Sequence, residues 1–67
     1  MITRVSVISN YAYQSWMVGQ KDVATIEVES IILPDSVKIL VYVARDEVGK
    51  RMGQVNVANP LVIITEE

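Results

Sequence analysis

The chain has 67 residues, of which 51% are hydrophobic, and a formal net charge of −2 at pH 7. A chain of this length forms one domain, residues 1–67, and buries only about 60% of its unfolded surface, so its stability is marginal without reinforcement. The absence of Cys and His excludes disulfides, the usual zinc ligand sets and catalysis by His or Cys.

Self-association is the reinforcement that remains for a small domain of this composition, so we expect a homo-oligomer. Six Lys and Arg residues in a slightly acidic chain do not favour nucleic acid as a partner, because that affinity comes from neutralised phosphates. No segment resembles a signal peptide, and no apolar run approaches the ~20 residues of a membrane span. We therefore expect a soluble, cytoplasmic protein that does not bind membranes.

The chain is rich in β-branched residues, with twelve Val and eight Ile, which is typical of β-sheets. The first predicted strand covers residues 2–9, where Val5 and Val7 alternate with polar residues. Residues 10–22 interrupt this pattern, contain three of the four aromatic residues and end in a predicted turn at 19–22. A β-ribbon through Tyr11, Tyr13 and Ser15 is an alternative for this segment.

The second predicted strand covers residues 23–33, with Ile26 and Val28 facing the interior, and Pro34 begins the turn after it. The third, residues 37–45, is apolar on both faces and so needs cover on both sides, for which a second subunit is a candidate. The alternative is a helix over residues 36–49, which the alternating β-branched residues disfavour.

Residues 46–53 form a predicted charged loop, with a short helical turn at 46–51 as an alternative. The last predicted strand covers residues 54–65 and is broken at Pro60, which cannot donate to a ladder. Together these elements predict an all-β fold. We expect a small antiparallel sheet or compact barrel of about five short strands, completed by self-association.

The aromatic cluster Tyr11, Tyr13 and Trp16 is the main candidate site, because Tyr and Trp dominate the binding energy of protein interfaces. Two alternatives stay open. Trp16 and one Tyr can instead plug the end of a barrel or a subunit seam. The cluster can also stack a nucleotide base, with a cationic rim supplied from neighbouring loops by Lys21, Arg45, Lys50 and Arg51.

Catalytic motifs are absent from the sequence. The paired carboxylates Glu27 and Glu29 fit a solvated strand face, and the pair at 46 and 47 fits a turn. The three glycines read as isolated turn residues, with no phosphate-binding loop. We therefore expect no enzymatic activity, no cofactor and no metal site.

The predicted function is a non-enzymatic binding protein that self-associates and holds a protein partner through Tyr11, Tyr13 and Trp16. Inhibition of the partner, or service as its accessory subunit, is a role that suits a binder of this size. The alternative is a small-ligand binding protein that holds a nucleotide or another anion with the same aromatics and the cations Arg45, Lys50 and Arg51.

Overall fold

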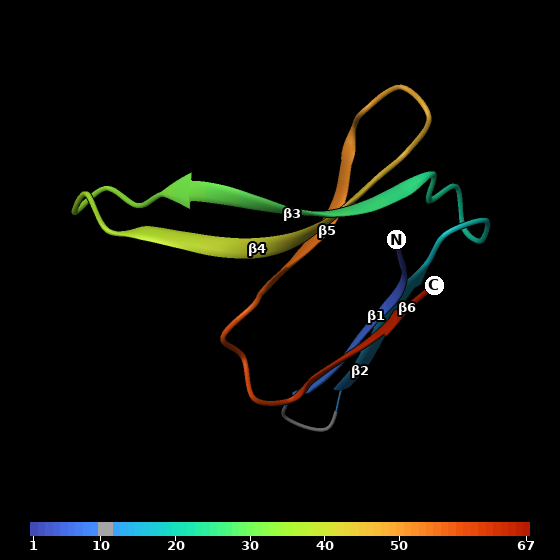
Figure 1. The fold of residues 1–67 in the computed structure, drawn as a ribbon, viewed down its shortest axis with the longest axis horizontal. Coiled ribbons are helices and arrows are strands. Elements are labelled where there is room, and N and C mark those ends of the chain that lie inside the picture. Colours follow the sequence, from blue (N-terminus) through green and yellow to red (C-terminus); the bar gives the residue numbers. More distant parts are fainter. Residues whose placement is uncertain (10–11) are drawn as a thin grey trace.

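The computed structural model describes residues 1–9 and 12–67, and the ordered elements are six β-strands (Figure 1). The all-β prediction is confirmed, and the described residues contain no helix. There is one strand more than expected, because part of the predicted aromatic break is itself a strand. The strands are β1 (Ile2–Ser9), β2 (Ala12–Met17), β3 (Thr25–Ile32), β4 (Lys38–Arg45), β5 (Arg51–Asn56) and β6 (Val62–Glu66).

The strands form two antiparallel three-stranded sheets, with the orders β2-β1-β6 and β3-β4-β5. In the first sheet, β1 lies between its sequence neighbour β2 and the distant β6. The two ends of the chain therefore lie side by side (Figure 1). The amide of Glu67 donates a hydrogen bond to the carbonyl of Met1 at 2.8 Å, which extends the β1–β6 pairing.

The hydrophobic core lies between the two sheets and is made by the inward face of each strand. Alternation sends Val5 and Val7 of β1 inward, while Ser6 between them lies on the outer face. β-branched side chains fill this narrow space well because each has few rotamers to lose. The buried cluster consists of Val5, Val7, Val23, Ile26, Ala44 and Val55, and the partly buried residues against it are Ile2, Trp16, Val18, Tyr42 and Val62.

Residues 38–45 are a strand, so the helix considered for residues 36–49 is wrong. Val41 and Val43 lie on the face of β4 that points away from the core, yet each is only 1% exposed. Their register neighbours on β3 are Glu29 and Glu27. Both faces of β4 are thus buried at these two positions within a single chain, and completion of the fold by a second subunit stays a prediction.

The loop between β4 and β5 is a turn closed by Asp46, and the short helical turn considered there is wrong. The Asp46 carboxylate accepts hydrogen bonds from the backbone amides of Val48 at 3.1 Å and Lys50 at 2.8 Å. Pro60 lies between β5 and β6, where the predicted break occurs. Within the described part of the chain, no helix has the length and apolar character needed to span a membrane.

Candidate functional site

Strand β2 places Tyr13 and Trp16 on opposite faces of its sheet. Tyr13 pairs with Ile8 and points to the outer face, whereas Trp16 pairs with Val5 and points toward the core. Since side chains alternate along a strand, residues three positions apart cannot share a face of it. The third aromatic of the predicted cluster, Tyr11, lies outside the described residues. The two described aromatics thus lie on opposite faces of β2, although both line one pocket at its edge.

Trp16 is half-buried and packs against Gly53 of β5. A Cβ atom on residue 53 would lie 2.4 Å from Cζ2 of the indole, closer than any real contact. Gly53 is therefore a strand residue that makes room for the indole, and its interpretation as a turn residue is wrong. This position fits the alternative interpretation, in which Trp16 fills the end of the core. A role of Trp16 in binding a partner stays a prediction.

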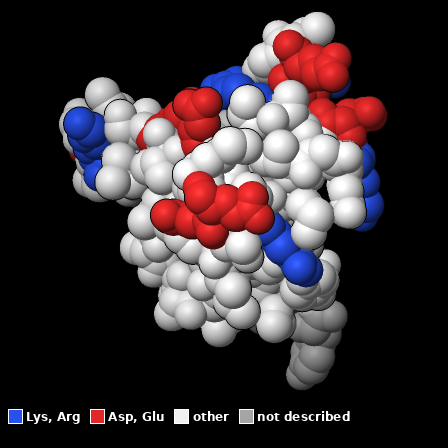
Figure 2. Space-filling view, turned by 45° about the vertical axis from the view of Figure 1, so that its right-hand side comes forward, with Lys and Arg blue, Asp and Glu red and all other residues white. Residues whose placement is uncertain are grey.

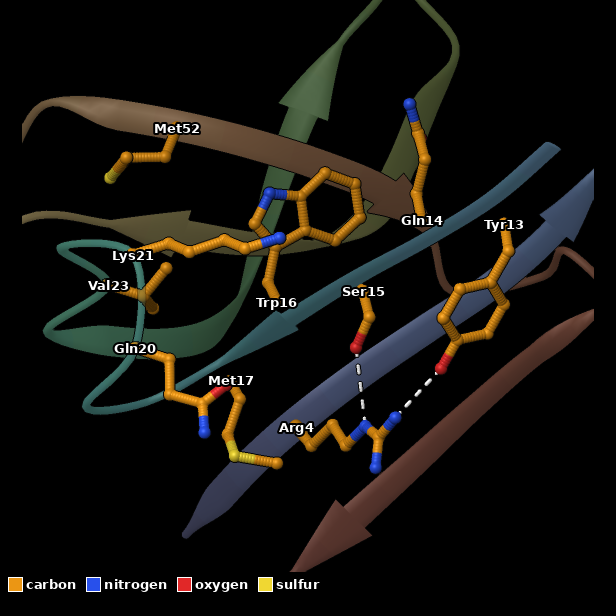
Figure 3. Close-up of a pocket in the computed structure, with 10 residues that line it drawn as sticks. All are labelled: Arg4, Tyr13, Gln14, Ser15, Trp16, Met17, Gln20, Lys21, Val23 and Met52. Atoms are coloured by element: carbon orange, nitrogen blue, oxygen red, sulfur yellow. Dashed lines mark hydrogen bonds between the residues drawn. The ribbon is translucent and has the colours of Figure 1, made fainter.

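The exposed side of Trp16 lines a pocket of about 540 Å³, here called the Trp16 pocket. Lys21 extends toward the indole in this pocket (Figure 3). Lys21 and Asp22 have φ values of 49° and 66°, and the amide of Val23 donates to the carbonyl of Gln20 at 3.0 Å. Two successive positive φ values make this a type I′ turn, which holds Lys21 beside the indole.

Tyr13 lies on the outer face of the β2-β1-β6 sheet and is 57% exposed. Its hydroxyl donates to Oγ of Ser6 at 3.2 Å and accepts from Nη2 of Arg4 at 2.8 Å. Arg4 also donates from Nε to Oγ of Ser15 at 3.3 Å (Figure 3). Hydrogen bonding with Ser6, then Ser15 and Arg4, lowers the pKa of Tyr13 from its ordinary value. The exposed phenol is thus held in one orientation.

Apolar side chains surround Tyr13 on this outer face. Ile8, Leu61 and Ile63 are all exposed, and they line a shallow hollow of about 230 Å³ together with Tyr13 and Arg4. We call this surface the Tyr13 face, defined as Arg4, Ile8, Tyr13, Leu61 and Ile63. It combines an ordered aromatic ring, an arginine and exposed aliphatic groups, which is the composition enriched in protein interfaces.

The predicted cationic rim does not gather around the aromatics. Arg45 binds the Glu29 carboxylate twice, from Nη2 to Oε1 at 2.8 Å and from Nε to Oε2 at 3.0 Å. Its Nη1 donates to the carbonyl of Gly49 at 2.8 Å. Arg51 lies 4.0 Å from the same carboxylate, and Lys50 is exposed in the adjoining loop. Of the four predicted cations, only Lys21 lines the Trp16 pocket.

Two of the four candidate carboxylates, Glu29 and Asp46, are engaged in structural contacts. Hydrogen bonding from Arg45 lowers the pKa of Glu29, and the Asp46 carboxylate closes its turn. Among residues 1–9 and 12–67, no three acidic side chains converge in a way that could hold a metal ion. Acidic and basic side chains lie in small separate groups on the face shown in Figure 2, so neither sign dominates there.

Several residues of these two sites were not singled out from the sequence. Arg4, Leu61 and Ile63 join Tyr13 only because β1 pairs with both β2 and β6. The alternation of apolar and polar residues along a strand does not indicate which strands pair. For Met52 the sequence left two positions open, a gap filler or a rim beside Trp16. It lines the Trp16 pocket as the extra residue of a β-bulge opposite Arg45. The Gly at position 53, inside an alternating run, was the one available signal of a close approach.

Comparison of the chain with protein-family models, with curated proteins and with solved structures found no match.

Proposed function

We propose that this chain is a non-enzymatic binding module that holds a protein partner on the Tyr13 face. One observation supports this above all others: an exposed tyrosine is fixed by two hydrogen bonds in the middle of exposed aliphatic side chains. A ring ordered before binding loses little conformational entropy when a partner covers it. The proposed contact surface therefore centres on Tyr13 and leaves Trp16 to the core.

Binding through one small face suits a protein that acts by covering a functional surface of its partner. An inhibitor or an accessory subunit works in this way, and either role needs no reactive group on the module itself. The aliphatic residues of the Tyr13 face would supply the buried area, and Arg4 would supply hydrogen-bond donors at the rim.

The test uses three purified chains: the wild type, Tyr13→Ala and Val48→Ala. Each is first used to retain a protein from the same lysate, and its affinity for the identified partner is then measured. Tyr13→Ala removes the ring. Val48→Ala is the control, because Val48 is 89% exposed on the loop between β4 and β5. We expect Tyr13→Ala to weaken the affinity by about 30-fold or more, as loss of an interface hot spot does, and Val48→Ala to leave it unchanged. Unchanged Trp16 emission in both variants would verify that the fold is intact.

Two outcomes would contradict this proposal. One is that the wild-type chain retains no protein. The other is that Tyr13→Ala retains the same protein with the wild-type affinity.

A second candidate function is favoured by the geometry of the Trp16 pocket, where a lysine lies beside an indole. This arrangement suits a small anion that carries an aromatic ring, such as a nucleotide, with the base stacked and Lys21 on a phosphate. We expect ATP to quench Trp16 emission in a saturable way, and Lys21→Gln to weaken the apparent affinity severalfold. Lys50→Gln, which changes a lysine outside the pocket, is the matched control. No quenching at millimolar ATP, or equal loss in both variants, would remove this candidate.

A further inference from the structure

The hairpin of β3 and β4 extends beyond the rest of the molecule as a two-stranded arm (Figure 1). Near its tip, Ser30 pairs with Leu40 and Ile32 with Lys38. An isolated two-stranded hairpin is marginally stable in water. Only the end of the arm beyond Leu40 has two strands, because β5 pairs with β4 up to there, and a surface packed on this end would stabilise it.

One face of the arm carries exposed apolar side chains, with Ser30 and Lys38 between and beside them. Register places Val28, Leu40 and Ile32 on the face that, nearer the body, carries the core residues Ile26 and Ala44. Val28 and Leu40 are each 48% exposed, and Ile32 is 75% exposed. We call Val28, Ile32 and Leu40 the arm face. It continues the core-facing side of the second sheet past the area that the first sheet covers.

The size of the molecule gives a second, independent indication. Its accessible surface is 4859 Å². A folded monomer of its mass, 7.5 kDa, exposes about 4,250 Å², so this chain exposes roughly 600 Å² more. Each partner in a stable interface buries about 800 Å². The excess is therefore of the size that one side of a small stable interface covers.

We propose that the arm face binds a second copy of this chain, with the two arms packed face to face about a two-fold axis. In such an interface the same patch serves both copies, so it must tolerate its own charges. The arm meets this requirement. Its tip carries one charge of each sign, Asp35 and Lys38, and Glu29 at its base is neutralised by Arg45. This interface is separate from the Tyr13 face and leaves that face free.

The experiment compares Ile32→Glu with Ile63→Glu by light scattering on a sizing column, over about 1 µM to 1 mM chain. The two isoleucines are matched, since Ile32 is 75% exposed and Ile63, on the Tyr13 face, is 64% exposed. The new glutamate at position 32 would lie opposite Lys38, so the hairpin keeps a favourable cross-strand pair while the arm face gains a charge.

We expect the wild-type chain and Ile63→Glu to have the mass of two chains. Ile32→Glu should dissociate at concentrations about 30-fold higher than the wild type or more, as expected for a central contact. A monomeric wild type, an assembly larger than two chains, or a dimer that survives in Ile32→Glu would overturn the proposal. Loss of the dimer in Ile63→Glu alone would instead place self-association on the Tyr13 face.

Discussion

At the scale of single residues, the fold depends on a few close contacts, because its small core has little room to rearrange around a larger side chain. The contact between Trp16 and Gly53 is the tightest of them, because the large indole lies against bare backbone. Interiors are packed at crystal density, so even one added methyl group at such a point forces a displacement. The residue that sets the position of Trp16 is therefore a glycine on another sheet.

Gly53→Ala should destabilise the fold by about 1–3 kcal/mol, the usual cost of overpacking a close-packed site. The free energy of unfolding can be measured by urea denaturation. Trp16 is the only tryptophan, so its emission reports on the displaced indole directly. We expect the emission of the variant to shift toward the red as the ring moves outward.

A double-mutant cycle separates this contact from other effects of the substitution. In a Trp16→Leu background the smaller side chain leaves room for the new methyl group, so Gly53→Ala should cost much less. An equal cost in both backgrounds would show that Trp16 is not what excludes a side chain at position 53.

At the scale of elements, β4 illustrates how a strand in a very small protein obtains cover on two sides. One face packs on the core, and on the other face Val41 and Val43 are each only 1% exposed. Arg45, Val43 and Val41 share that outer face, and Glu29 lies beside Val41. The ion pair between Arg45 and Glu29 therefore crosses the sheet beside the valines.

This ion pair makes stability depend on pH in a defined direction. Hydrogen bonding from Arg45 lowers the pKa of Glu29 below its ordinary value of 4.5. The folded state therefore binds this proton less readily than the unfolded state. The stabilisation is fully present above about pH 4.5 and is lost as the pH falls through the lowered pKa.

Glu29→Gln tests the pH dependence, with Glu27→Gln as the matched control on the same strand face. The free energy of unfolding of the wild type should exceed that of Glu29→Gln at about pH 6, and the difference should shrink toward about pH 3. Glu27→Gln should show a smaller difference from the wild type, because the carboxylate of Glu27 forms neither of the hydrogen bonds to Arg45. A difference for Glu29→Gln that stays constant over this range would contradict the assignment.

The elements also show what the sequence could and could not predict. Strand β1 was predicted with its observed bounds because Val5 and Val7 alternate with Arg4, Ser6 and Ile8 and the pattern breaks after residue 9. Strand β2 was given only as an alternative, since aromatic and polar residues on both of its faces blur the alternation. The separation of Tyr13 from Trp16, and of Arg45 from both, depends on strand pairing, which no local pattern encodes.

At the scale of the whole molecule, the described residues form two three-stranded sheets that share a cluster of six buried residues. The radius of gyration, 12.0 Å, exceeds the ~10.9 Å of a compact chain of this length, in keeping with the projecting arm. The Tyr13 face and the arm face lie on different sheets, so a dimer through the arms would present two Tyr13 faces. A partner with two matching sites would then be held by both at once, with a gain from effective concentration.

The pairing of β1 with β6 also sets the order in which this protein is completed during synthesis. Strands β3, β4 and β5 are sequence neighbours and can pair as soon as they have been made. Strand β1 must wait for its second neighbour, since Val7 pairs with Val62 and Ile2 with Glu66. Leu61 and Ile63 belong to the Tyr13 face, so a nascent chain cannot present that face before β6 has left the ribosome. The proposed binding surface would therefore form only in chains whose translation has passed through β6.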